Sequence, residues 1–262
     1  MVITLDGKDA LVCGSTQGIG LAAARMIAEL GAEVTLAARS KERLLAQRAG
    51  LPKDAGRTHG ILVADWNDPA DLEAKVKLHI RERGPFHILV NNTGGPPPGD
   101  IIAARPEELQ QAMTQHLICN QVLVQAVVPG MRELGYGRII NIISTSVRQP
   151  IPGLGVSNTA RGAVASWAKT LSLELAPFGI TVNNVLPGYT DTDRLRNLIE
   201  ARAAKAGVPP AHIEREMLGQ VPAGRFGRPE EIAAVIAFLA SPAASYVNGV
   251  SLPVDGGRTS AI

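Results

Sequence analysis

Three glycines near the start of the chain, Gly14, Gly18 and Gly20, have a spacing that could bind the phosphates of a dinucleotide. They follow the apolar run 9–13 and precede an alanine-rich stretch that ends near Leu30. After a strand, Gly14 would permit a tight turn, Gly18 a close approach of the backbone to a pyrophosphate, and Gly20 close packing of the next helix. The amino end of that helix would add amide donors and a positive dipole. We therefore predict a phosphate site in one segment, called the glycine turn, which comprises Gly14, Ser15, Thr16, Gln17, Gly18, Ile19 and Gly20.

The end of the second apolar run bears on which dinucleotide would bind. An acidic residue at this point would accept hydrogen bonds from the ribose hydroxyls and favour NAD. The chain has Arg39 followed by Ser40 instead. A guanidinium group binds phosphate oxygens bidentately, so this pair suits the 2′-phosphate of NADP. The alternative is a solvated arginine at a strand end. The expected cofactor is NADP(H) rather than NAD(H).

These groups need a scaffold, and the chain supplies apolar runs that alternate with helical stretches. The apolar runs occupy residues 9–13, 33–38, 60–64, 86–90, 137–144, 180–185 and 250–257. Such alternation implies right-handed crossovers and a parallel sheet that is covered on both faces. The predicted fold class is α/β: a single-domain Rossmann fold over residues 1–262, with a doubly wound, seven-stranded parallel sheet flanked by helices.

Prolines should mark the ends of several helices. Asp68 before Pro69 is predicted to cap the helix that follows the third run. Residues 106–134 are predicted to form one long helical stretch that is broken near Pro129, because proline lacks the amide that a helix interior needs. Residues 193–219 are predicted to be helical with a break at Pro209-Pro210.

Composition excludes several classes of protein. The chain has 262 residues, of which 45% are hydrophobic and 19% charged, as is usual for a soluble globular domain. A net charge of +2 gives no electrostatic reason to expect nucleic-acid or membrane binding. Cys13 and Cys119 suggest neither a disulfide framework nor a metal site. No apolar run approaches the roughly 20 residues of a membrane span, and no signal peptide is evident, so we expect a cytoplasmic protein.

The segment 91–94, Asn-Asn-Thr-Gly, follows the fourth run, and together with the G-x-x-x-G-x-G spacing of the glycine turn it resembles the short-chain dehydrogenase/reductase family. The resemblance covers roughly residues 5–257 and is closest to 3-oxoacyl-acyl-carrier-protein reductases. It implies a substrate lid at about residues 191–220 and a homotetramer, with a homodimer as the alternative. It also implies a cofactor cleft lined by Asp65, Asn92, Gly94, Arg161, Pro187, Gly188, Thr190 and Thr192.

The same resemblance places four catalytic positions, and the chain departs from the family at three of them. Ser144 at the end of the fifth run matches the serine that orients the substrate. The Tyr-x-x-x-Lys pair of the family falls on Ser157 and Arg161, and the asparagine falls on His116. The resemblance implies that Arg161 could still hold the nicotinamide ribose, although arginine cannot relay a proton.

Carbonyl reduction requires a hydride on carbon and a proton on oxygen, and the missing phenol is the usual proton donor. A serine hydroxyl is a far weaker acid, and loss of a general acid costs about 10²- to 10⁴-fold in rate. His116 titrates in a suitable range and could act directly or through water and Ser157. Its alternative role is to fill the structural place of the asparagine at a helix bend. Tyr189 is a second candidate phenol, whereas Tyr136 should lie on the wrong side of the sheet.

Two functions remain open. The first is an NADP(H)-binding oxidoreductase with a degenerate catalytic tetrad. Its substrate would be a small carbonyl or alcohol compound, with acyl-thioester-linked compounds among the candidates. The second is a catalytically silent nucleotide-binding protein, serving as a sensor or in assembly. A third function, that of the halohydrin-dehalogenase-like proteins, is disfavoured. Those proteins keep a Ser-Tyr-Arg set and lose the dinucleotide site, whereas this chain lacks the tyrosine and keeps Gly14, Gly18 and Gly20.

Overall fold

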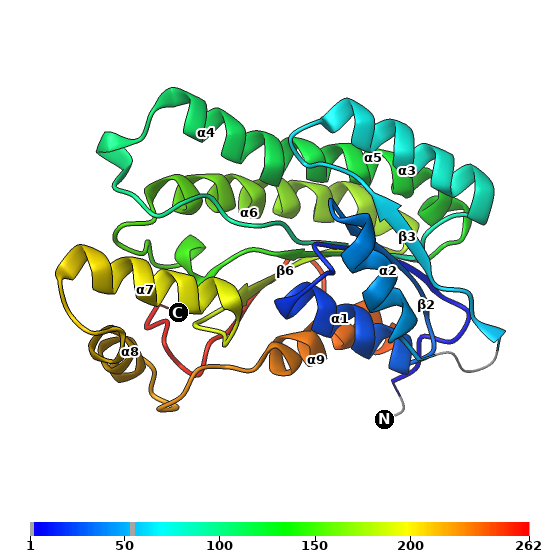
Figure 1. Cartoon of the computed structure of the whole chain (residues 1–262). Helices are drawn as coiled ribbons and strands as arrows, with labels where there is room; N and C mark the ends of the chain where they lie inside the picture. The colour runs from blue at the N-terminus through cyan, green and yellow to red at the C-terminus, as the bar shows by residue number, and fades with distance from the viewer. Residues whose placement is uncertain (1–2, 53–55, 262) are drawn as a thin grey trace.

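The computed structural model describes residues 3–52 and 56–261, and the strands within these ranges form one parallel sheet (Figure 1). The strands are β1 (Asp9–Cys13), β2 (Glu33–Ala38), β3 (Gly60–Val63), β4 (Ile88–Asn91), β5 (Gly137–Ile142), β6 (Ile180–Pro187) and β7 (Ser251–Val254). Their order in the sheet is β3-β2-β1-β4-β5-β6-β7. The predicted seven-stranded, doubly wound sheet is confirmed, and predicted strand ends differ from those observed by up to three residues.

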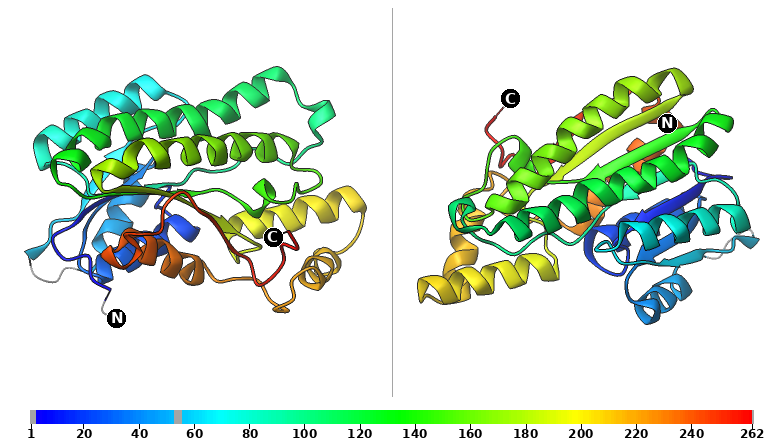
Figure 2. Two further views of the ribbon diagram at one scale, coloured as in Figure 1. Left: turned by 180° about the vertical axis from the view of Figure 1, so that it is seen from behind. Right: turned by 90° about the horizontal axis from the view of Figure 1, so that it is seen from above.

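Helices cover both faces of the sheet (Figures 1 and 2). The helices are α1 (Gly18–Glu29), α2 (Lys41–Ala49), α3 (Pro69–Arg83), α4 (Pro106–Met113), α5 (Cys119–Glu133), α6 (Gly155–Leu175), α7 (Asp193–Ala206), α8 (Pro210–Gly219) and α9 (Pro229–Ala240). Helices α1, α2 and α9 lie on one face, and α3 to α6 lie on the other. Asp68 caps α3 as predicted, since its side chain accepts a hydrogen bond from the Asp71 amide at 3.0 Å.

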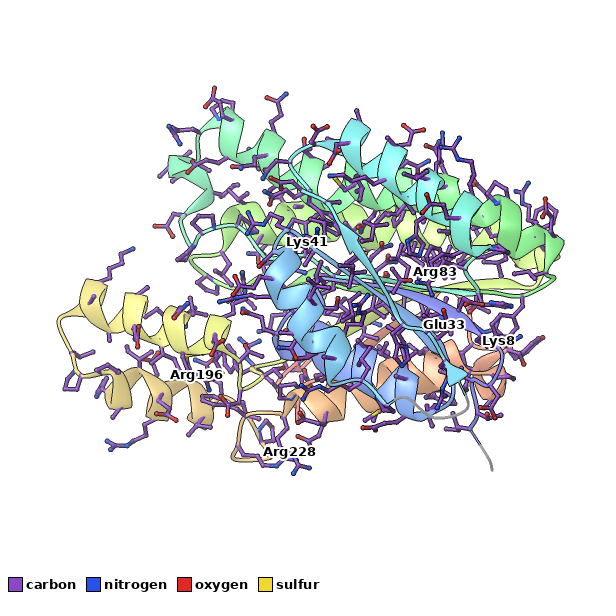
Figure 3. The ribbon with its side chains drawn as sticks, turned by 45° about the vertical axis from the view of Figure 1, so that its right-hand side comes forward. Lys8, Glu33, Lys41, Arg83, Arg196 and Arg228 are labelled. Atoms are coloured by element: carbon purple, nitrogen blue, oxygen red, sulfur yellow. The ribbon has the colours of Figure 1, made fainter. Side chains whose placement is uncertain are left out.

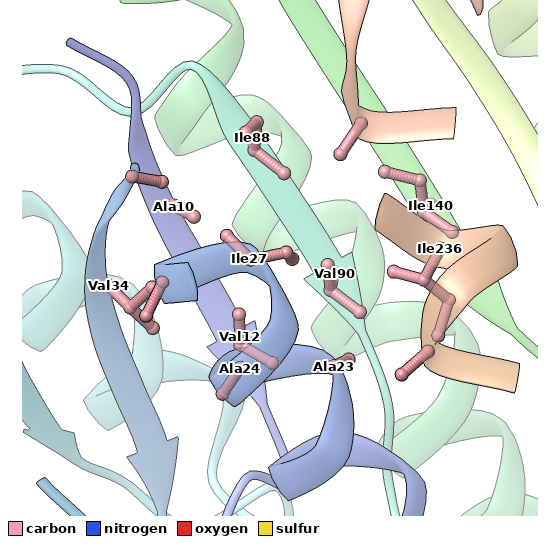
Figure 4. Packing of buried hydrophobic residues seen from close by; sticks show 14 of the residues in the cluster. Ala10, Val12, Ala23, Ala24, Ile27, Val34, Ile88, Val90, Ile140 and Ile236 are labelled. Carbon is pink, nitrogen blue, oxygen red and sulfur yellow. The ribbon is translucent and has the colours of Figure 1, made fainter. Parts of the chain in front are cut away.

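Small residues allow α1 and α9 to approach the sheet closely (Figure 4). Ala23 and Ile27 of α1 pack with Val12 of β1, Ile88 of β4 and Ile236 of α9, and all of these side chains are fully buried. Burial of aliphatic side chains stabilises the fold by about 25 cal/mol for each Å² removed from water. This layer fixes the start of α1, and therefore the glycine turn, against the sheet.

A row of buried side-chain amides crosses four neighbouring strands. Asn91 donates to Asn141 at 2.9 Å, Asn141 donates to Asn184 at 3.0 Å, and Asn184 donates to the Ser251 hydroxyl at 3.0 Å. Each of these pairs is also a register pair of the parallel sheet. Because buried polar groups require partners, this ladder favours one alignment of β4, β5, β6 and β7.

The prediction of a helix break near Pro129 is wrong. Pro129 lies inside α5, and the irregularity is a π-helical turn between α4 and α5 at Thr114–Ile118. Proline frees the carbonyl of the residue four positions earlier, here Gln125. Both Gln125 and Pro129 are exposed, so water can satisfy that carbonyl and the helix continues. The π turn instead carries His116, in keeping with the frequent use of such turns at functional sites.

Helices α7 and α8 form a separate layer beside the sheet, with a break before Pro210 as predicted (Figure 1). They share a small apolar core of Leu195, Ile199, Ile213 and Met217. At the opposite end of the sheet, an ion pair between Glu33 and Arg83 joins β2 to α3 (Figure 3). Within the described ranges, no helix combines the length and apolarity that crossing a lipid bilayer requires.

Candidate active site

Parallel strands bring their carboxyl ends to one edge of the sheet, where ligands bind in open α/β folds. The glycine turn follows β1 at this edge. The segments after β2, β3, β4, β5 and β6 carry the other predicted site residues. The topology therefore gathers groups that are more than one hundred residues apart in the sequence.

The glycine turn requires glycine at the positions predicted from its spacing. Gly14 has φ +59° and Gly18 has φ +55°, a region that other residues rarely adopt. A Cβ atom on Gly14 would lie 2.6 Å from Nδ2 of Asn92, and one on Gly20 would collide with the Gly14 carbonyl oxygen. Asn92 holds the turn in place by donating to the carbonyls of Cys13 and Gly14, each at 3.3 Å.

Ser15 and Gln17 have structural partners within this region. Ser15 is fully buried, and its Oγ accepts a hydrogen bond from the Ala37 amide at 3.0 Å. The Ser15 side chain therefore ties the turn to β2, and a contact of Ser15 with the cofactor stays a prediction. Gln17 is exposed and accepts a hydrogen bond from Arg43 at 3.1 Å, while Thr16 and Ile19 are half-buried beside it.

The end of β2 presents two guanidinium groups rather than one. Arg39 is exposed and has no ion pair within the described part of the chain. Ser40 caps α2 by accepting from the Arg43 amide at 3.3 Å, which places Arg43 in the first turn of that helix. Sequence analysis missed Arg43, although its position three residues after a capping serine was a usable signal. Asp65, at the end of the neighbouring β3, accepts hydrogen bonds from Asn67 at 3.0 Å.

The loop after β6 folds back toward the glycine turn. Pro187 ends β6, and Thr190 is buried and donates to the Gly188 carbonyl at 3.2 Å. Thr192 caps α7 by accepting from the Leu195 amide at 3.4 Å. A Cβ atom on Gly18 would lie 3.3 Å from the Thr192 methyl group, so the start of α7 lies against the glycine turn.

Ser157 and Arg161 form a buried pair under the end of β5. Arg161 donates through Nε to Ser157 at 3.2 Å, and through Nη1 to the carbonyls of Ile143 at 2.8 Å and Ile142 at 3.2 Å. Ser144 comes next in the chain and is half-buried, with its Oγ accepting from the Ser146 amide at 3.1 Å. Burial, followed by the charge of Arg194, lowers the pKa of Arg161 to about 10, which leaves it protonated at neutral pH.

His116 lies in the π-helical turn and is 5% exposed. Its Nδ1 shares a hydrogen bond with Oγ1 of Thr93 at 2.8 Å, whereas its Nε2 is buried without a partner in the structure. Burial lowers the pKa of His116 to about 3, with further lowering by the charges of Arg161 and Arg194. The expectation that His116 titrates near neutral pH is therefore wrong, because charging this buried ring would place a further cation near Arg161 and Arg194.

The two tyrosines weighed as phenols are engaged elsewhere. The Tyr189 hydroxyl hydrogen-bonds Gln220 and Arg258, each at 3.1 Å, so it contacts the end of α8 and the C-terminal segment rather than Ser144 or Ser157. Tyr136 donates to the Ala240 carbonyl at 2.7 Å, before β5 begins. It lies at the opposite end of the sheet, as predicted.

Arg194 is a site residue that sequence analysis missed. It lies at the start of α7, and its Nη1 donates to the Gly95 carbonyl at 3.0 Å, across 99 positions of sequence. Partial desolvation lowers the pKa of Arg194, although the residue as a whole is exposed, and its charge lowers the pKa of both Arg161 and His116. The one available signal was its place two residues after Thr192. Among the described residues, no group of three or more His, Cys, Asp or Glu side chains could hold a metal ion.

The strand order, the glycine turn after β1 and the loop after β6 together define a Rossmann-type fold of the short-chain class. The family model described as enoyl-(acyl carrier protein) reductase matches residues 14–259. The chain therefore belongs to the short-chain dehydrogenase/reductase family.

Relatives and a solved structure match this chain over nearly its whole length. A 3-oxoacyl-acyl-carrier-protein reductase of Vibrio cholerae is 36% identical over 255 residues, covering 97% of this chain and 98% of the relative. A D-beta-hydroxybutyrate dehydrogenase of Cupriavidus necator is 34% identical over 258 residues, covering 97% and 98%. The L-sorbose reductase of Gluconobacter frateurii, solved with NADPH and L-sorbose, matches with a TM-score of 0.93 and 30% identity over the whole of both chains.

Proposed function

We propose that the protein is an NADP(H)-dependent oxidoreductase that transfers hydride between the cofactor and a small carbonyl or alcohol substrate. The observation that carries the proposal is the pair of guanidinium groups at the end of β2, beside a glycine turn that a Cβ atom would fill. Arg39 has no carboxylate partner in the described structure, so it is free to bind a 2′-phosphate. Relatives named as reductases and dehydrogenases, and a structural neighbour solved with NADPH, support the same assignment.

The residues of the chain fit the cofactor in a defined way. The glycine turn would hold the pyrophosphate, Arg39 and Arg43 the 2′-phosphate, and the segment 187–192 would cover the nicotinamide. When bound, the nicotinamide supplies or accepts a hydride. Asp65, Asn92 and Gly94 would line the remaining cleft, with Asn92 acting mainly by holding the glycine turn.

The protein's own chemistry would be electrostatic. As hydride reaches the carbonyl carbon, negative charge develops on the oxygen, and the buried cation Arg161 would stabilise it. Ser144 and Ser157 would orient the oxygen. The proton would come from water through the Ser157 hydroxyl, because His116 has a pKa of about 3 and is neutral at physiological pH. This is a non-standard proton donor for the fold, and we expect slow turnover for that reason.

A second function is favoured by one specific observation. The Arg161 guanidinium donates to the Ser157 hydroxyl and to the carbonyls of Ile142 and Ile143, and neither Ser157 nor Arg161 is a strong acid. A catalytically silent nucleotide-binding protein, acting as a sensor or in assembly, would have such a site.

Cofactor titration and turnover separate the two functions. We expect NADPH to bind more tightly than NADH, measured by fluorescence, and to be consumed with at least one member of a panel of aldehydes, ketones, oxo acids and 3-oxoacyl thioesters. NADPH binding without consumption by any compound would favour the silent protein. Failure to bind either cofactor would overturn both functions.

A further inference from the structure

Two guanidinium groups of the active site have no acidic partner. Neither Arg161 nor Arg194 forms an ion pair among the described residues, and no carboxylate raises the pKa of either. The nearest acids in sequence to Arg194 are Asp191 and Asp193, and both are bound by Arg196, which is labelled in Figure 3. Arg194 instead reaches the Gly95 carbonyl at 3.0 Å.

Such an arrangement is costly unless an anion joins it. Arg161 is buried, whereas Arg194 is exposed beside it, and a buried charge without a counter-charge is destabilising. A third group lies near them, since His116 Nε2 is buried and makes no well-formed hydrogen bond, although the Gly94 backbone is close enough to the ring to raise its pKa. In the tautomer in which Thr93 donates to Nδ1, Nε2 carries a proton and is a free donor. Two cations and one donor therefore act on the same region.

We propose that Arg194, together with His116, binds a carboxylate group of the substrate, so that the enzyme acts on oxo acids or hydroxy acids rather than on neutral carbonyl compounds. The inference rests on the proposed function, whose substrate class it narrows. A guanidinium group binds a carboxylate through two parallel hydrogen bonds, and the imidazole N–H would supply a third. Arg161 would remain under the reacting oxygen, next to Ser144.

The cofactor pyrophosphate is the competing anion, because Thr192 lies against the glycine turn only two residues before Arg194. The contacts favour the substrate. The guanidinium of Arg194 hydrogen-bonds Gly95 and acts electrostatically on Arg161 and His116, and it makes no hydrogen bond to residues 14–20 in the described structure.

The test is a calorimetric titration of the NADP⁺ complex with acetoacetate and 2-oxo-4-phenylbutanoate, each beside its methyl ester. We expect the wild type to bind at least one acid about 10- to 100-fold more tightly than its ester. Arg194→Gln should remove this preference, and Arg194→Lys should restore part of it. Arg196→Gln is the matched control, two positions along the same helix and already paired with Asp191 and Asp193, and it should keep the preference.

Each other outcome is decisive. Equal affinity for both acids and their esters in the wild type would overturn the inference, as would an Arg194→Gln variant that keeps the preference. Arg194→Gln could also weaken NADP⁺ binding as much as it weakens binding of the acid. That result would assign Arg194 to the pyrophosphate and would overturn the inference. A preference for the acid without NADPH consumption would support the carboxylate site and would overturn the proposed reduction. If NADP⁺ does not bind, the same titration of the free protein decides the inference.

Discussion

At the scale of single residues, Arg161 determines what the active site can do. Its planar group makes hydrogen bonds to Ser157 and to the carbonyls of Ile142 and Ile143 at the same time. Because arginine stays charged, the site keeps a positive charge beside the end of β5 but gains no acid that can titrate. The site is thus suited to stabilising a negative oxygen, and poorly suited to protonating it quickly.

Replacement of Arg39 tests the choice of cofactor. Arg39→Ala should weaken NADPH binding about 10- to 100-fold, because it removes one charge-assisted phosphate contact, and should leave NADH binding within about two-fold. Fluorescence titration of both cofactors measures the ratio. Arg48→Ala, further along α2, is the control for loss of a positive charge. Equal weakening of both cofactors by Arg39→Ala would assign the residue a structural role.

Removal of His116 tests its burial in the neutral form. In the unfolded chain its pKa is near 6.5, whereas in the folded protein it is about 3. The unfolded state therefore binds more protons in this window, and the free energy of unfolding falls as pH decreases from 6.5 toward 3. Between pH 7 and pH 5, the free energy of unfolding should fall by about 2 kcal/mol more in the wild type than in His116→Asn.

Urea denaturation at both pH values measures this difference. His212→Asn removes an exposed histidine and is the control. If His116→Asn and the wild type lose the same free energy of unfolding on acidification, the histidine is not held neutral by its surroundings.

Sequence analysis located His116 and Arg161 but could not give their properties. The pKa of His116 depends on burial and on two arginines that are 45 and 78 positions away in the sequence. Arg194 was missed for the same reason, since its contact with Gly95 exists only once the loop after β6 folds over the loop after β4.

At the scale of helices and strands, the strands were the most predictable part of the fold. Apolar runs bounded by turn residues gave β1 and β2 with their observed ends. The helical region 106–134 was less predictable. The cost of a proline depends on whether water reaches the freed carbonyl, and the chain alone does not say which face of α5 is exposed.

The amide ladder across β4 to β7 can be tested at its centre. Asn141→Leu should leave the buried Asn91 donor and the Asn184 acceptor without partners, and should lower the free energy of unfolding by roughly 2–5 kcal/mol. Chemical denaturation measures the loss. Asn197→Ala, on the exposed surface of α7, should change it by less than about 0.5 kcal/mol. A loss below about 1 kcal/mol in Asn141→Leu would mean that the ladder contributes little to stability.

At the scale of the whole molecule, the expected homotetramer remains a prediction. The resemblance implies assembly through the helices of the fourth and fifth crossovers and through the last strand, and apolar side chains are exposed on α6 and β7. Leu173 of α6 is 68% exposed and Leu252 of β7 is 37% exposed. In the expected tetramer, a neighbouring subunit would cover these two side chains.

Light scattering after size exclusion measures the assembly directly. We expect a mass four times that of the 27.5 kDa chain. Leu173→Glu should shift it to smaller species, because it would bury a charge in the interface. Leu78→Glu, at an exposed position on α3, should not. A wild-type mass equal to one chain would rule out the predicted assembly.

The central claim is that this fold transfers hydride although the tyrosine and lysine of the family are replaced. The most direct test uses NADPH that carries deuterium at the transferred position, incubated with the carbonyl panel and followed by mass spectrometry of the products. We predict deuterium on the former carbonyl carbon of at least one product, and a rate about 10²- to 10³-fold lower in Arg161→Met because the developing oxyanion loses its cation. Tight NADPH binding with no deuterium in any product would contradict the account.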